Sequence, residues 1–165
     1  MSPHTTARHH RGAAPVGVLA EMDPVELAAI RHLRLWFSGK QDHIWHDFHN
    51  RLDPQEAEQA MLNLETLMDA VQYDCRRPVM RHSESCDCVG GDESAFSHFI
   101  AAAHAGEMQE ALTFGLLLFR GSSAHHLLEP AAHCGRIFAC LADLHMPRSI
   151  AQTASPTHPM PKARQ

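Results

Sequence analysis

Apolar side chains recur every three or four residues along most of the chain, the spacing that gathers them on one face of an α-helix. The pattern is clearest over residues 54–73. Its stripe there consists of Ala57, Met61, Leu64, Met68 and Val71. No useful length of chain alternates apolar and polar residues as a half-buried strand does. The sequence therefore predicts an all-α fold.

Two stretches carry the same helix start signal. In each, an aspartate able to cap a helix is followed by a proline at the first helical position and a glutamate two residues later: Asp23-Pro24-x-Glu26 and Asp53-Pro54-x-Glu56. Gly39 supplies a stop signal between them. The first half of the chain is thus predicted to hold helices over 24–38, 41–52 and 54–73.

The second half predicts a helix capped by Asp92, a helix over 107–120 and a last helix over 122–145. The segment 107–120 is apolar nearly all round its second half, which predicts the most buried helix. Pro130 is expected to kink the last helix or divide it in two. The fold class is therefore a single-domain bundle of about five or six helices.

The predicted bundle domain spans residues 22–145, and a chain of 165 residues with 44% apolar content suits one domain. Residues 1–21 and 146–165 are rich in Pro, Ser, Thr and His and have no apolar period, so disordered tails are expected there. We find no apolar run near the ~20 residues needed to span a bilayer and no signal peptide. A soluble, cytoplasmic protein is expected.

The charge balance narrows the expected partners. The formal net charge of −5 offers no general attraction for nucleic acid or an anionic membrane. The chain is also rich in histidine, with 15 histidines against 14 Lys and Arg, and most of them are expected to be polar surface residues whose charge varies with pH. The expected partner is another protein.

The loop predicted over residues 75–92 combines thiols with an imidazole. It contains the set Cys75, His82, Cys86 and Cys88, and zinc prefers four ligands of these two kinds. Cys86 and Cys88 are two residues apart, so their side chains share a side where the chain is extended. The sequence therefore predicts a structural zinc in the loop, with Cys75 as the least certain ligand.

The same loop has two further interpretations. Cys86 and Cys88 are a candidate thiol pair for a redox sensor or enzyme, because neighbouring arginines favour the thiolate. Alternatively, the loop is an ordinary solvated segment in which Asp87, Asp92 and Glu93 pair with the three arginines. Those residues, Arg76, Arg77 and Arg81, are also the candidates for binding an acidic partner or an anion.

Histidines on the predicted helices give weaker signals. His43, His46 and His49 fall opposite the face of Ile44, Trp45 and Phe48, which predicts solvated histidines and a buried Trp45. A second set, His126, Glu129 and His133, has ligand types suited to an open zinc site but lies on a polar helix face.

Known catalytic motifs are missing from the sequence, including nucleotide-binding glycine loops and metalloprotease motifs. The helix over 54–73 carries no Lys or Arg, which argues against its reading DNA. We therefore expect a non-catalytic binding or regulatory module with a structural zinc in the 75–92 loop. A thiol sensor or enzyme using Cys86 and Cys88 is the alternative.

Overall fold

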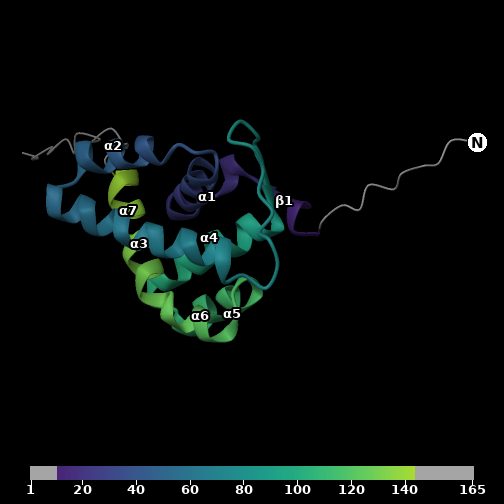
Figure 1. Cartoon of the computed structure of the whole chain (residues 1–165). Coiled ribbons are helices and arrows are strands. Elements are labelled where there is room, and N and C mark those ends of the chain that lie inside the picture. Colours follow the sequence, from purple (N-terminus) through teal and green to yellow (C-terminus); the bar gives the residue numbers. More distant parts are fainter. Residues whose placement is uncertain (1–10, 144–165) are drawn as a thin grey trace, which may run out of the picture.

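The computed structural model in Figure 1 describes residues 11–143 and confirms the all-α class. Its helices are α1 (Pro24–Phe37), α2 (Gln41–Arg51), α3 (Pro54–Tyr73), α4 (Gly91–Ala105), α5 (Met108–Leu118), α6 (Gly121–His126) and α7 (Leu128–Asp143). None of the helices in this range is long and apolar enough to cross a membrane. The predicted tails at residues 1–10 and 146–165 lie outside the described residues.

The two predicted helix starts are confirmed. The carboxylate of Asp53 accepts a hydrogen bond from the backbone N–H of Glu56 at 3.0 Å, and Glu26 accepts one from the backbone N–H of Asp23 at 3.4 Å. α4 ends at Ala105, and the next residue, Gly106, has a positive φ of 80° that suits a residue without a side chain. These local signals lie within a few residues of the helix ends they specify, which is why the sequence reveals them.

The last predicted helix is divided in two, as Pro130 suggested. α6 ends at His126 and α7 begins at Leu128, so Pro130 lies in the first turn of α7. A proline is tolerated there because the backbone N–H groups of a first turn have no partner within the helix.

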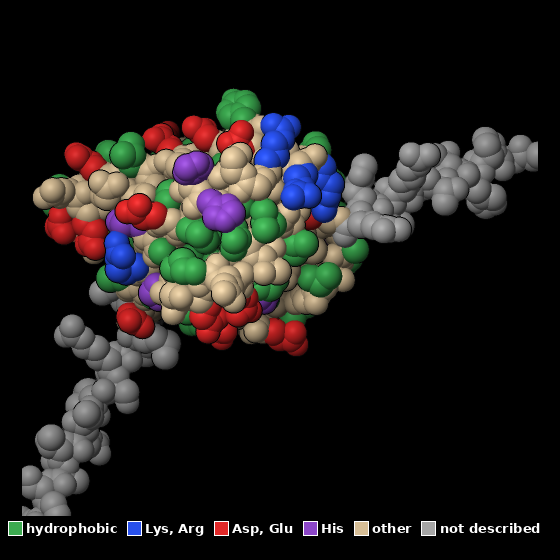
Figure 2. All heavy atoms as spheres, turned by 90° about the horizontal axis from the view of Figure 1, so that it is seen from below, with side chains coloured by type: hydrophobic (Ala, Val, Ile, Leu, Met, Phe, Trp, Pro, Cys, Tyr) green, Lys and Arg blue, Asp and Glu red, His purple; other side chains and the backbone are tan. Residues whose placement is uncertain are grey.

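The central helix is α4 rather than α5, so the expectation that residues 107–120 are the most buried is wrong. α4 packs against α1, α5 and α7, and its Phe96, Phe99 and Ile100 are fully buried. α5 lies at the edge of the bundle, where Leu117 is 61% exposed. α5 and α6 lie at the lower end of the molecule in Figure 1. Figure 2 views the molecule from that end and shows hydrophobic side chains near the middle of the exposed face.

Residues 11–21 differ from the disordered tail predicted for them. They form a short 3-10 turn (Arg11–Ala13), strand β1 (Pro15–Val18) and a second 3-10 turn (Leu19–Glu21). β1 pairs antiparallel with β2 (Cys88–Gly90), with Val18 opposite Cys88. The pairing gives these backbone groups partners that the local sequence does not supply, and it fixes the last residues of the 75–92 loop beside α4.

Candidate functional site

The 75–92 loop joins α3 to α4, and its first residues are bound to the end of α5. The backbone N–H of Arg76 donates to the carbonyl of Leu118 at 2.9 Å, and that of Arg120 donates to the carbonyl of Asp74 at 3.1 Å. Cys75 and Phe119 form the antiparallel bridge between these two bonds. The start of the loop is thus held by backbone contacts with a segment more than 40 residues away.

Arg34, from the last turns of α1, holds the far part of the loop. Its side chain is 2% exposed and donates to the carbonyl oxygens of Ser83, Cys86 and Cys88 at 3.2, 2.6 and 2.6 Å. It also donates from Nε and Nη2 to the two carboxylate oxygens of Glu93, at 2.7 and 2.9 Å. One buried guanidinium therefore satisfies three loop carbonyls and a carboxylate.

Glu93, in the first turn of α4, is fully buried, and its carboxylate accepts hydrogen bonds from the loop as well as from Arg34. The backbone N–H groups of His82 and Gly90 donate to it at 3.0 and 2.9 Å, and Nδ1 of His82 lies 3.0 Å from its Oε2. Burial raises the pKa of Glu93, but the hydrogen bonds from Arg34, Gly90 and His82 outweigh burial and hold that pKa below its usual range. Glu93 is therefore a charged carboxylate in the core.

Asp92 performs a similar role for the middle of the loop. It is 4% exposed and accepts two parallel hydrogen bonds from Arg77, at 2.7 and 2.6 Å, and one from the backbone N–H of Met80 at 2.8 Å. The interpretation in which Asp92 pairs with a loop arginine is confirmed. Glu93, by contrast, pairs with Arg34 of α1 and not with an arginine of the loop.

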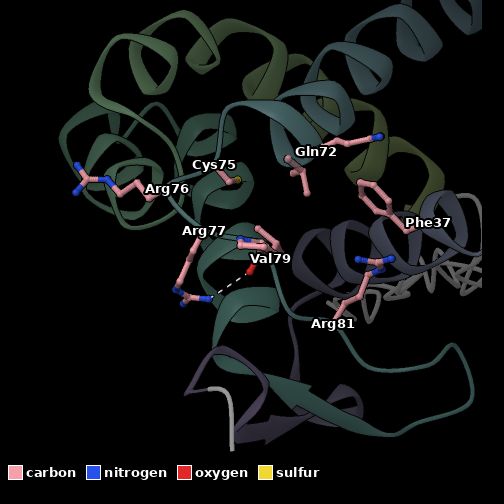
Figure 3. Close-up of a pocket in the computed structure, with 9 residues that line it drawn as sticks. Phe37, Gln72, Cys75, Arg76, Arg77, Val79 and Arg81 are labelled. Atoms are coloured by element: carbon pink, nitrogen blue, oxygen red, sulfur yellow. Dashed lines mark hydrogen bonds between the residues drawn. The ribbon is translucent and has the colours of Figure 1, made fainter. Parts of the chain in front are cut away.

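A cavity of about 500 Å³ opens between the start of the loop and the ends of α1 and α3 (Figure 3). It is lined by Phe37, Val71, Gln72, Cys75, Arg76, Arg77, Pro78, Val79 and Arg81. All three predicted anion-binding arginines thus border one cavity. In the close-up, Arg76 points away from the side on which Arg81 and Phe37 lie, so the three guanidinium groups do not converge.

The three arginines have different partners. Arg77 is committed to Asp92, and Nε of Arg76 donates to the carbonyl of Phe119 at 3.1 Å. The guanidinium of Arg81 lies over the ring of Phe37, 4.4 Å from its centroid. Within residues 11–143 no carboxylate forms a salt bridge with Arg76 or Arg81. These two arginines therefore keep charge available for a ligand.

Two of the loop cysteines, Cys75 and Cys88, have thiols whose pKa is raised. Burial raises the pKa of the Cys75 thiol to about 11, and the neighbouring carboxylates of Asp92 and Asp74 add to the effect. The pKa of Cys88 is also raised, first by a hydrogen bond with the Cys86 side chain and then by the charge of that neighbour. Cys86 and Cys88 are close, as predicted, but Cys88 is held as a thiol rather than the reactive thiolate.

The four predicted zinc ligands are not gathered into one site. Across the described residues, no three His, Cys, Asp or Glu side chains are grouped so that they could hold a metal ion, which covers both the loop set and the set His126, Glu129 and His133. In the loop, Nδ1 of His82 is bonded to Glu93, and the backbone of Cys75 forms a β-bridge with that of Phe119. Zinc binding through Cys86, Cys88 and His82 stays a prediction. Because Nδ1 of His82 is bonded to Glu93, Nε2 is the ring nitrogen that would bind a metal.

The sequence interpretation overlooked Arg34. The residue falls among Ile30, Leu33 and Phe37 on the apolar stripe of α1, which is the signal that could have revealed it. A charged residue at a core position of a helix requires a buried partner of opposite charge, and Glu93 occupies the corresponding face of α4. The two positions are 59 residues apart in the chain, so the sequence does not show that Arg34 and Glu93 are partners.

The fold and site together define a helical domain whose interhelical loop is clamped by a buried arginine–glutamate pair. Comparison of the chain with models of protein families, with curated proteins and with solved structures finds no match. The proposed function therefore depends on the geometry of this chain.

Proposed function

We propose that this chain is a non-catalytic binding module and that Arg81, at the rim of the loop cavity, binds an acidic segment of a partner protein. The observation that carries the proposal is the exposed guanidinium of Arg81, which lies over Phe37 beside a cavity of about 500 Å³ and has no carboxylate partner among the described residues.

The chemistry of arginine supports this choice of ligand. A guanidinium that lies over an aromatic ring is stabilised by the face of the ring. The N–H groups of the guanidinium point outward in its own plane, so they remain able to donate. A carboxylate matches those donors with two parallel hydrogen bonds. Arg76, on the same cavity rim, adds positive charge that attracts an acidic segment, although it points away from Arg81.

The clamped loop supports the proposal as well. Binding costs less when the residues that contact the ligand are already ordered. Here Arg34, Glu93 and Asp92 hold the backbone of the loop on both sides of Arg81. This ordering comes from protein groups alone, so the proposal for Arg81 is independent of the predicted zinc.

Arg81→Ala is the variant that tests the proposal. We expect it to weaken binding of a fluorescein-labelled hexaglutamate peptide by roughly two- to fivefold, because an ion pair at the surface contributes up to about 1 kcal/mol. Fluorescence anisotropy at low salt provides the measurement. Arg77 is a poor target, since its removal would leave the buried carboxylate of Asp92 without its arginine.

Arg136→Ala is the matched control. Arg136 is exposed on α7, so its substitution removes the same charge from a different element. It should leave the affinity for hexaglutamate nearly unchanged. Equal losses in Arg81→Ala and Arg136→Ala would show a response to net charge only, and that result would refute a site at Arg81.

The thiol alternative has weaker support. A redox sensor needs a cysteine that ionises easily, whereas burial and neighbouring negative charge raise the pKa of Cys75, and hydrogen bonding to Cys86 raises that of Cys88. Arg34 is the arginine that acts to lower the pKa of Cys88, and its charge is already shared with Glu93. We therefore favour the binding module.

A further inference from the structure

A second groove lies between α2 and α3, on residues that the loop site does not use. Its cavity has a volume of about 560 Å³. The lining residues are Gln41, Asp42, Trp45, Glu58, Met61, Leu62 and Glu65. Apolar and acidic side chains thus border the same groove.

The apolar part of the groove comes from two large exposed side chains. Trp45 is 39% exposed and Leu62 is 59% exposed. The prediction of a buried Trp45 is therefore wrong: Ile44 and Phe48 turn toward the core, while the Trp45 ring lies at the surface against the ring of His49, with 3.8 Å between centroids. A tryptophan and a leucine exposed in one groove indicate a contact surface.

The charged part of the groove has a single sign. Asp42, Glu58 and Glu65 form no salt bridge within residues 11–143. Along its whole length, α3 carries no Lys, Arg or His that would neutralise them. The ligand that complements this groove is therefore a basic segment with apolar side chains.

The chain itself contains such a segment. All 19 of its acidic residues lie between Glu21 and Asp143, whereas the segment 146–165 carries Arg148, Lys162 and Arg164 and no acidic residue. The segment also supplies the apolar residues Met146, Ile150 and Met160. Its charge and its apolar side chains both complement the groove.

The end of α7 places this segment within reach of the groove. Phe138 of α7 stacks on His32 with ring centroids 4.5 Å apart, and the same His32 ring lies 5.6 Å from that of Phe48 in α2. Figure 1 shows the last turns of α7 close to α2. Twenty residues of extended chain span roughly 65 Å, which exceeds the length of either helix bordering the groove.

We propose that residues 146–165 dock in the α2–α3 groove of their own chain. The apolar side chains of the segment cover Trp45 and Leu62, and its basic side chains pair with Asp42, Glu58 and Glu65. The segment thereby occupies a surface that is otherwise open to a basic segment of another protein. This inference does not depend on the function proposed for Arg81.

Zero-length cross-linking of the unmodified full chain with a carbodiimide tests the proposal, because the reagent joins a lysine only to a carboxylate in direct contact with it. The chain has two lysines, Lys40 and Lys162. Lys40 lies 2.7 Å from Glu84 and serves as an internal positive control. We expect peptide mapping by mass spectrometry to find Lys162 joined to Asp42, Glu58 or Glu65 in preference to other carboxylates.

The apolar contact is tested by the variants Leu62→Asn and Leu117→Asn. The two leucines are almost equally exposed, at 59% and 61%, but Leu117 lies on α5. Leu62→Asn should reduce the yield of the Lys162 cross-links, and Leu117→Asn should leave it unchanged. Lys162 links spread evenly over the surface, or absent while Lys40 joins Glu84, would overturn the proposal.

Mixing chains labelled with ¹⁴N and ¹⁵N identifies which chain supplies the segment. Cross-linked peptides of uniform label support docking within one chain. Mixed labels would show that a second copy supplies the segment, which would overturn the assignment to the same chain.

Discussion

Replacing Arg34 with methionine is expected to lower the free energy of unfolding by about 3–5 kcal/mol, the usual effect of removing one partner of a buried ion pair. Methionine fills part of the space but leaves the carboxylate of Glu93 buried without its cation. It also removes the donor to the carbonyls of Ser83, Cys86 and Cys88. Denaturation by urea, followed by far-UV circular dichroism, measures the change.

Arg31→Met provides the control for this variant. Arg31 is exposed on the same helix, so its replacement should change the free energy of unfolding by less than about 0.5 kcal/mol. If Arg34→Met were no more destabilising than Arg31→Met, the buried pair would not be holding the loop.

Glu93→Gln is expected to have an effect of similar size, about 3–5 kcal/mol at neutral pH. The amide keeps the shape of the side chain but leaves the charge of Arg34 unpaired in the core. It also replaces one acceptor oxygen with an NH₂ group, which is a donor. The N–H groups of His82 and Gly90 and the guanidinium of Arg34 all donate toward this position, so the NH₂ group would face other donors. Urea denaturation of both proteins gives the difference.

The pH dependence of this effect has a defined sign. The pKa of Glu93 in the folded chain is lowered from its ordinary value of 4.5 by the hydrogen bonds that outweigh burial. Its contribution is therefore complete above about pH 4.5 and is lost as the pH falls through the folded pKa. The gap in stability between wild type and Glu93→Gln should narrow in that acidic range.

Glu84→Gln is the matched control, because Glu84 lies in the same loop and pairs with Lys40 at the surface. Solvent screens an exposed ion pair of this kind, so Glu84→Gln should be much less destabilising than Glu93→Gln. Equal effects of the two substitutions would contradict a special role for the buried carboxylate.

Local signals explain what the sequence could predict. The Asp-Pro-x-Glu starts of α1 and α3 were identified correctly because the cap and the residues it contacts are neighbours in the chain. The apolar periods likewise predicted the buried stripe of α3 and the all-α class. Trp45 was placed wrongly because periodicity gives the face of a helix but not how far the neighbouring element covers that face.

The candidate site was predicted only in part, because its contacts join distant segments. The three arginines and the cysteines were correctly assigned to one loop between helices. The residues that hold this loop are Arg34 of α1, the first turn of α4 and strand β1, whose residues pair with partners 70 or more positions along the chain. A single sequence carries no record of such pairings, so the ion pair that holds the loop could not be predicted from it.

The central claim is that Arg34 and Glu93 hold the 75–92 loop in place, so that Arg81 is presented to a partner without help from a metal. Native-state hydrogen exchange of the His82 and Gly90 amides, recorded by NMR in excess chelator, tests it most directly. We predict that both amides are protected with chelator present and that Glu93→Gln abolishes their protection. Rapid exchange in wild type that becomes slow only when zinc is added would contradict the claim and would support the zinc site through Cys86, Cys88 and His82.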